Sequence, residues 1–279
     1  MAMWDTFSNQ LLIRGELVAT TALRIGSGVE ALDPAGADLP VIRDSLGRPF
    51  IPGSSLRGVL RSHVERIVRS LEPSPGQGQG ACDPVTENAW CIRGEHMEEF
   101  RKQEQSKGPG GLAELVWKRS CRVCRVFGSP WLASRVRITD LYPVEGNPWH
   151  IQVRDGVAID RDKETVRNKY DFEVVTAGAR FQLEIVADNL DEVERGLLWL
   201  VVRELRDGRL RVGGFRGRGL GSVRVEKLKL QFVSAEDRDK WLAYLVKGEM
   251  QDLQPDVADE WLNALIHEMT GGRECTAVS

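Results

Sequence analysis

The sequence predicts an α+β protein built around a ferredoxin-like sheet, with elements in the order strand, helix, strand, strand, helix, strand. The first observation is that segments of alternating apolar and polar residues are separated by two segments with apolar residues at helical spacing. The second is that the connections are rich in glycine, proline or charge. RNA-recognition modules share this order. The strands are expected at 10–25, 134–143, 179–187 and 222–232, and the helices at 54–71 and after residue 191.

The chain of 279 residues is long enough for one large core with insertions. We expect residues 1–233 to form one domain that contains two insertions, at 72–133 and 144–177. Residues 234–279 contain two amphipathic segments and are expected to form a helical extension. This extension carries a net charge of −6, and the remaining residues carry +3. A mildly basic body with an acidic tail is compatible with local nucleic-acid-binding patches.

The connection after the first strand begins at Gly26-Ser27-Gly28 and continues through small, acidic and turn-forming residues to Asp38. Such a composition is typical of a mobile loop. Asp44 is best explained by its own turn, because Asp44-Ser45-Leu46-Gly47 is a run of turn-forming residues.

The first helix is expected to begin after Pro52-Gly53, with Ser54 or Ser55 accepting a hydrogen bond from the first turn. Arg57 and Arg61 lie off its apolar stripe, one turn apart, beside a helix N-terminus that favours anions. This arrangement predicts a phosphate cradle; the alternative is an ordinary amphipathic helix with a solvated basic face. The apolar stripe consists of Leu56, Leu60, Val64, Ile67 and Leu71.

The cysteines of the insertion at 72–133 point to a metal. Cys121 and Cys124 form a CxxC pair, whose spacing lets two thiolates bind one tetrahedral ion, and Cys82 and Cys91 lie upstream. We therefore expect structural Zn²⁺ at these four residues, with His96 as a substitute ligand. The alternative is that some of them are buried free thiols. No role is expected for Cys275, near the C-terminus.

The insertion at 144–177 is polar and charged, with β-forming residues at both ends, which predicts a protruding hairpin. By itself its charge pattern indicates only a solvated face. After the strand at 179–187, Asn189 or Asp191 is expected to cap the second helix. The basic residues of the hairpin that are candidates for RNA contact are Arg154, Arg161, Lys163, Arg167 and Lys169.

The glycine-rich run from Gly213 to Gly221 precedes the last strand. It contains no GK[ST] sequence, and it leads into a strand, so it fits neither a Walker loop nor a dinucleotide fingerprint. Glycines allow close backbone approach, and arginines can contact phosphates, which favours an RNA backbone. The alternative is a tight turn with exposed arginines. The candidate contact residues are Gly214, Arg216, Gly217 and Arg218.

No apolar run approaches 18 residues, and no leader sequence is recognisable, so we expect a protein without membrane contact in the cytoplasm. Five cysteines without a leader fit a reducing compartment.

The sequence contains no nucleophile elbow and no HExxH motif. Asp38 is the best catalytic candidate, because it ends a loop beside the expected phosphate cradle and could bind Mg²⁺ or assist attack by a 2′-hydroxyl. Asp33 and Glu30 compete with it. His63 lies at the edge of the apolar stripe and is expected to be structural.

Five blocks of the sequence together resemble the RAMP superfamily, and among its members they are most similar to the repeated backbone subunit of type III CRISPR effector complexes. The similarity covers about residues 8–232 and excludes the acidic extension. The blocks are LRIGSG at 23–28, ADLPVIRDSLGRPFIPGSSLRGVLR at 37–61, CRVCRVFGS at 121–129, GVAIDRDKETVRNKYDFEVVTAGARF at 156–181 and GFRGRGLGSV at 214–223.

The resemblance implies a ferredoxin-like palm that holds guide crRNA, a zinc-containing lid, and a thumb hairpin that folds over the guide–target duplex. It further implies that Asp38 drives Mg²⁺- or Mn²⁺-dependent cleavage of target RNA, with Asp33 as the alternative. The expected partners are guide crRNA, target RNA, further backbone subunits and other effector subunits. Two alternatives stay open: a non-catalytic RNA-binding scaffold, and a stand-alone, metal-independent guide-processing ribonuclease that uses His63.

Overall fold

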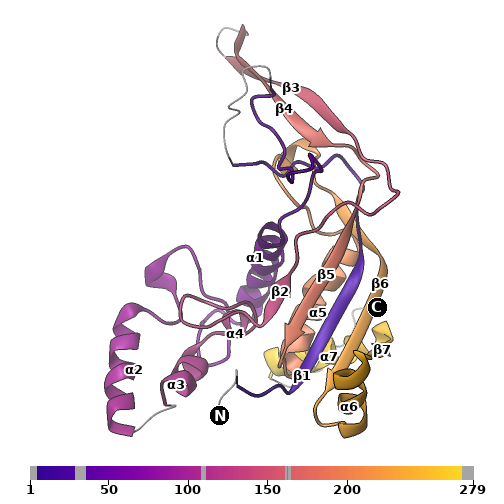
Figure 1. Ribbon diagram of the computed structural model, residues 1–279. Coiled ribbons are helices and arrows are strands. Elements are labelled where there is room, and N and C mark those ends of the chain that lie inside the picture. Colours follow the sequence, from indigo (N-terminus) through magenta and orange to yellow (C-terminus); the bar gives the residue numbers. More distant parts are fainter. Residues whose placement is uncertain (1–4, 29–35, 108–110, 161, 163–164, 272–279) are drawn as a thin grey trace, which may run out of the picture.

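A computed structural model describes residues 5–28, 36–107, 111–160, 162 and 165–271. Its centre is a five-stranded antiparallel sheet in the order β2-β5-β1-β6-β7 (Figure 1). This arrangement confirms the α+β class. The strands are β1 (Asn9–Ala19), β2 (Val136–Ile138), β5 (Arg180–Asp188), β6 (Val223–Ser234) and β7 (Gln251–Leu253).

Alternation of side chains explains how the sheet covers its core. In β1, Leu11, Ile13 and Leu17 are all at most 1% exposed. β5 alternates in the same way, with Phe181 and Ile185 buried. Because successive side chains of a strand point to opposite faces, one face of these central strands is apolar and faces the helices.

Helices α1 (Gly53–Leu71) and α5 (Glu192–Arg206) contact each other and supply the apolar layer that completes the core. Asp191 caps α5, and a reciprocal capping box joins Asp191 and Glu194. Asn189, the other candidate cap, instead adopts a left-handed conformation at φ 54°. The C-terminal extension packs on α5 through α7 (Pro255–Met269).

The first insertion lies on the β2 side of the sheet, and its helices α2 and α3 extend away from the strands (Figure 1). It contains the short helix η1 (Glu87–Ala89), α2 (Gly94–Lys107), α3 (Gly111–Arg119) and α4 (Arg122–Phe127). Arg122 on α4 binds Glu72 at the end of α1 and Glu268 on α7. These ion pairs connect the insertion, the palm helix and the C-terminal extension.

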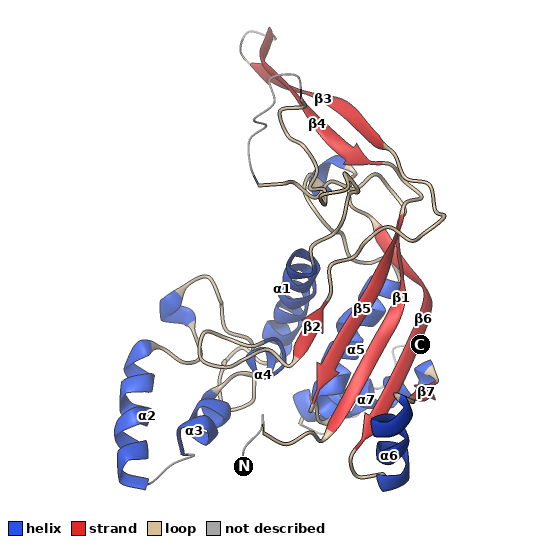
Figure 2. Cartoon of the chain, in the orientation of Figure 1, coloured by secondary structure: helices blue, strands red, loops and turns tan. Residues whose placement is uncertain are grey.

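The second insertion forms the hairpin of β3 (Ile151–Asp160) and β4 (Thr165–Val175), a separate two-stranded sheet that projects from one end of the molecule (Figure 2). Its root is fixed by backbone hydrogen bonds in both directions between Leu23 and Val175, at 2.9 and 2.8 Å. Hereafter this hairpin is called the thumb.

The structure differs from the sequence expectation at two strands. The strand expected at 134–143 is regular only as β2, after which Leu141 and Pro143 make isolated bridges. The extension contains α6 (Arg238–Lys247) and α7, near the expected segments, but also β7, which was not expected. β7 is only three residues long, too short to give a recognisable alternation.

The expected serine cap of α1 is wrong. The helix begins at Gly53, its N-cap residue is Pro52, and neither Ser54 nor Ser55 caps it. Asp140 from the β2 connection accepts a hydrogen bond from the amide of Gly53 at 2.8 Å instead. A side chain at Gly53 would collide with the carbonyl of Ile138, so the helix start packs directly on this connection.

Candidate metal centre and nucleic-acid interface

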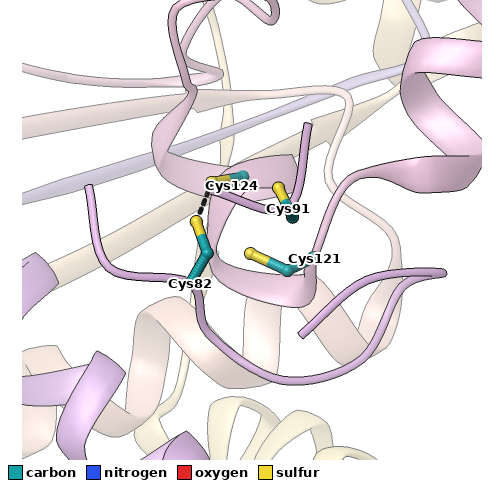
Figure 3. Close-up of side chains that lie close together, drawn as sticks. All are labelled: Cys82, Cys91, Cys121 and Cys124. Carbon is teal, nitrogen blue, oxygen red and sulfur yellow. Dashed lines mark hydrogen bonds between the residues drawn. The ribbon is translucent and has the colours of Figure 1, made fainter. Parts of the chain in front are cut away.

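Four buried cysteines of the first insertion converge on one point (Figure 3). Cys121 and Cys124 flank the start of α4, while Cys82 and Cys91 come from irregular segments that pass beside it. Their ligand atoms all lie within 4.8 Å of one another. Four thiolates at this separation match the ligand set of a tetrahedral metal site.

The sulfur geometry favours a metal over a disulfide. The sulfurs of Cys82 and Cys124, joined by the dashed line in Figure 3, lie 3.4 Å apart, well beyond a covalent bond of about 2.05 Å. The hydrogen bond between Cys121 and Cys124 lowers the pKa of Cys121 and raises the pKa of Cys124. Opposite shifts arise because the sulfurs are close together, so that ionisation of one thiol disfavours ionisation of its neighbour.

His96, the expected substitute ligand, takes no part in this group. Its Nδ1 accepts a hydrogen bond from the amide of Arg93 at 3.1 Å. The geometry therefore selects the four cysteines as the metal-binding set among the described residues.

Arg57 and Arg61 lie against the end of α4 and not on an open basic face. Arg57 donates to the carbonyl of Phe127, and Arg61 donates to the carbonyl of Gly128 at 2.9 Å and to Glu65 at 2.7 Å. Cations are favoured at a helix C-terminus, where the last carbonyl groups have no helical partner. The alternative of a solvated basic face therefore does not describe these two arginines, and RNA contact by them stays a prediction.

The helix start leaves two hydroxyl groups at the surface. Ser54 and Ser55 are exposed, and no side-chain capping bond engages either of them within α1. Their hydroxyls are thus accessible to a ligand. The serines remain candidates for RNA contact, although the reason differs from helix capping.

The glycine-rich run forms a compact loop against the thumb. Phe215 adopts a left-handed conformation at φ 54°, and its ring packs edge-on against Phe172 of β4 at 4.8 Å between centroids. The guanidinium groups of Arg24 and Arg218 lie 4.9 and 4.8 Å from the same ring. Arg218 also donates to the hydroxyl of Tyr170. Aromatic and cation–π contacts of this kind fix the loop relative to the thumb.

The loop and α1 face a common cavity of about 500 Å³. Arg216 and Gly217 line it from the loop, and Ser62, His63 and Arg66 line it from α1. The remaining lining residues are Val59, Arg209, Leu210 and Arg211. Four arginines around one open cavity make a site suited to an anion such as a phosphate.

The carboxylate of Glu204 reduces this positive charge. Arg209 pairs with Glu204 at 2.7 Å, and His63 Nε2 lies 3.4 Å from the same carboxylate. In contrast, the described part of the chain gives Arg66 and Arg216 no ion pair. These two arginines are the cations of the cavity best able to bind a ligand.

The thumb candidates are only partly described. Arg154 is exposed on β3 and contacts Gln152, while Lys169 pairs with Asp155 at 3.5 Å. Arg161 and Lys163 lie outside the described residues, as do Glu30 and Asp33. Arg167 belongs to β4, but its side chain is outside the description.

Asp38 lies where the connection after β1 meets the thumb. It is exposed, and its amide donates to Asp171 Oδ1 at 2.6 Å. The amide of Asp171 donates in return to Asp38 Oδ2 at 3.0 Å. Asp44 has a different environment, because it accepts hydrogen bonds from the amides of Leu46 and Arg48 within its turn.

Sequence reasoning missed several residues at these sites. Arg24, Arg66 and Arg211 are separate arginines without a local motif, and Tyr170 and Asp171 are ordinary members of a charged strand. Only the tertiary contacts bring them to the glycine loop, to α1 or to Asp38.

A larger cavity of about 750 Å³, near the start of α5, contains none of the predicted site residues.

Comparison with known proteins extends this picture. Residues 16–224 match the RAMP superfamily. The chain is 27% identical to the CRISPR system Cms endoribonuclease Csm3 of Methanocaldococcus jannaschii, over 81% of this chain and 82% of the relative. It is 27% identical to Csm3 of Methanothermobacter thermautotrophicus, over 81% and 87%, and 25% identical to Csm3 of Enterococcus italicus, over 76% and 88%.

Proposed function

Because this chain belongs to the RAMP superfamily, we propose that it is a crRNA-binding backbone subunit of a type III CRISPR effector complex, which also cleaves target RNA. The observation that carries the proposal is the basic cavity shared by α1 and the glycine loop. Residues from two separate parts of the chain meet there, so one nucleic-acid strand could contact both elements. The similarity to Csm3 proteins, which are named endoribonucleases, supports the same conclusion.

The strand order supports a ferredoxin-like palm. In chain order, β1, β2, β5 and β6 are accompanied by α1 between the first two and α5 between the last two. The central strands are β5 and β1, as in a split β-α-β arrangement. The first insertion is then the lid, and the β3–β4 hairpin is the thumb that folds over a guide–target duplex.

The guide is proposed to be held by its phosphates. Ser54 and Ser55 offer exposed hydroxyls, and Arg216 offers a cation without an ion pair in the described structure. Gly217 leaves the loop backbone open, because a side chain there would meet nothing within 4 Å, whereas the amide of Gly214 already donates to the carbonyl of Arg24. Arg218 joins the loop to the thumb through Tyr170. Phosphate contacts do not read sequence, which suits a subunit whose specificity comes from guide pairing.

The cysteine group is proposed to hold structural Zn²⁺ through Cys82, Cys91, Cys121 and Cys124. All four are at most 6% exposed, and a four-cysteine set without an open position is typical of structural zinc. The site fastens the segments around residues 82 and 91 to α4. Arg57 and Arg61 then fasten α4 to α1, so the metal would stabilise the lid against the palm.

Target cleavage is proposed to depend on Asp38. A divalent cation, Mg²⁺ or Mn²⁺, would stabilise charge on the phosphate that is cleaved. Asp38 would hold it through the carboxylate oxygen Oδ1, because Oδ2 already accepts the amide of Asp171. The exposed position of Asp38 between the palm and the thumb leaves room for an RNA strand.

The experiment that tests this function uses the assembled complex with guide RNA and a matched target. Asp38→Ala should abolish Mg²⁺-dependent target cleavage while guide content and target affinity stay at wild-type values. Unchanged cleavage by Asp38→Ala would reject the catalytic assignment.

A non-catalytic scaffold is the second candidate. One observation favours it. Among the described residues, three or more possible metal ligands come together only at the four cysteines, and not at Asp38. Within the described residues, Asp38 therefore has no ready-made set of protein ligands around it. A wild-type complex that binds target RNA without cutting it would select the scaffold function.

The guide-processing ribonuclease is less well supported. His63 is 19% exposed in its side chain and lies against Glu204, as expected for a structural residue. Cleavage of precursor RNA by the isolated chain in EDTA, with loss of cleavage in His63→Ala, would establish this alternative.

None of the described helices combines the length and apolar character needed to span a bilayer. The partners proposed for the chain are guide crRNA, target RNA, further backbone subunits and other subunits of the effector complex. The acidic residues 234–279 lie outside the matched region at 16–224, and α7 of this extension packs on α5.

A further inference from the structure

We propose that Asp171, on thumb strand β4, is a positioning residue that orients the carboxylate of Asp38 for target cleavage. This inference rests on the proposed function, since it requires Asp38 to act on the target. It assigns a role to a residue that no sequence motif singled out. It also places one determinant of cleavage on the thumb and not on the palm.

The evidence is a reciprocal pair of hydrogen bonds between residues 133 positions apart. The amide of Asp38 donates to Asp171 Oδ1 at 2.6 Å, and the amide of Asp171 donates to Asp38 Oδ2 at 3.0 Å. Hydrogen bonds to a carboxylate are stronger than those between neutral groups. Each side chain is therefore held by the backbone of the other, which restricts the rotation of the Asp38 carboxylate.

The backbone that follows Asp38 is fastened to β4 independently. The amide of Glu173 donates to the carbonyl of Leu39 at 3.0 Å, and the amide of Val41 donates to Glu173 Oε2 at 3.0 Å. Arg43 adds an ion pair to Glu173 at 2.5 Å. Because these contacts do not involve the side chain of Asp171, removing that side chain should free the backbone amide of Asp38 without detaching residues 39–43. The carboxylate of Asp38 would then keep only its bond from the amide of Asp171, on a backbone that is no longer fixed at residue 38.

Two substitutions separate positioning from charge. Asp171→Asn keeps the oxygen that accepts the amide of Asp38 but removes the negative charge, whereas Asp171→Ala removes both. If orientation matters, the asparagine variant should retain activity and the alanine variant should lose it. If the charge of Asp171 matters, both variants should lose activity together.

Asp155 provides a matched control. It is paired with Asp171 across the thumb and is exposed, so Asp155→Ala removes a carboxylate from the same part of the hairpin. Asp155 pairs with Lys169 at 3.5 Å and makes no ion pair with the described residues 36–43 around Asp38. We expect this variant to cleave like wild type.

The experiment measures single-turnover cleavage by the reconstituted complex at saturating target, over a range of Mn²⁺ and Mg²⁺ concentrations. Guide content and target dissociation constant are measured on the same preparations. Asp171→Ala should lower the rate constant by about 10- to 100-fold, since misplacement of a reacting group by about 1 Å has an effect of this size. Asp171→Asn should stay within about threefold of wild type, with unchanged guide content and target affinity for both variants.

Equal losses in Asp171→Asn and Asp171→Ala would overturn the positioning role, as would wild-type cleavage by Asp171→Ala. Reduced guide content in Asp171→Ala would also overturn it, because the positioning role predicts wild-type guide binding in both variants. Asp38→Ala is run in parallel to test the proposed function separately. If Asp38→Ala cleaves normally, the proposed function fails; if it is inactive and Asp171→Ala is normal, only the present inference fails.

Discussion

Replacing Arg122 by methionine should lower the free energy of unfolding by about 3–5 kcal/mol, because it leaves a buried carboxylate without its partner. The guanidinium of Arg122 is bidentate to Glu72, with hydrogen bonds of 3.0 and 2.6 Å. Arg122 is 4% exposed and Glu72 is 9% exposed. Burial alone would lower the pKa of Arg122, but hydrogen bonds to Glu72 and Glu268 hold that pKa above its usual value.

The two carboxylates bound by Arg122 should contribute very differently. The side chain of Glu268 is 53% exposed, so Glu268→Gln should lower the free energy of unfolding by at most about 1 kcal/mol. Glu72 also accepts the amide of Gly80 at 2.7 Å. The double variant Arg122→Met with Glu72→Gln keeps this acceptor and removes the unpaired charge, so it should recover about 1–4 kcal/mol of the loss.

The assay is urea unfolding of the zinc-loaded, RNA-free chain, followed by tryptophan fluorescence. The two single variants Arg122→Met and Glu72→Gln and the double variant form a double-mutant cycle, and the pair should show a coupling energy. A loss below about 1 kcal/mol in Arg122→Met would refute the reasoning, because it would mean that water reaches Glu72 and replaces the arginine.

Three further predictions concern the metal, the RNA and pH. Cys124→Ser should reduce bound zinc from about one equivalent per chain to below about half, measured by metal analysis, while Cys275→Ser should retain it. Arg66→Ala should weaken guide-RNA binding and reduce, by about 1, the slope of the logarithm of the binding constant against the logarithm of the salt concentration. The control is Lys240→Ala, which removes a cation of α6 that is paired with Asp237 and should leave this slope unchanged. A hydrogen bond from Arg209 holds the pKa of Glu204 below its usual value. This carboxylate therefore stabilises the fold at pH values above its unfolded pKa of about 4.3. The contribution is lost as the pH falls through the lower pKa of the folded state. Glu204→Gln should therefore be less stable than wild type in urea at about pH 6, and the difference should shrink progressively as the pH falls below about 4.3.

The comparison between sequence and structure is most favourable where a local pattern decides the element. β1 and β6 fall within two residues of one or both expected ends, because alternation of apolar residues directly encodes a strand with one buried face. α1 also lies almost where expected, and Leu56, Leu60 and Val64 of its expected stripe are fully buried. The last turn differs, because Val68 is buried there, while Ile67 is only partly buried and Leu71 is 51% exposed. The cysteine set was predicted from ligand chemistry, and its four members do lie together.

The errors occur where a distant segment replaces a local partner. Asp140 binds the amide of Gly53, so the serines that follow are not needed as caps. The carbonyls of Phe127 and Gly128, about 70 positions away, bind the arginines that helical periodicity placed in solvent. Periodicity shows which side chains leave the apolar stripe, but it does not show whether another part of the chain covers them.

The sequence by itself determined the family, the α+β class, the four candidate metal ligands and the aspartate proposed to cleave RNA, because each is marked by a short pattern or a characteristic residue type. Only the tertiary structure decided that α1 and the glycine loop share a cavity, that Arg57 and Arg61 pack against α4, and that Asp38 is paired with Asp171. The physical reason is that these contacts join segments separated by about 70 to 150 residues, and their geometry is fixed by the packing of the sheet, lid and thumb.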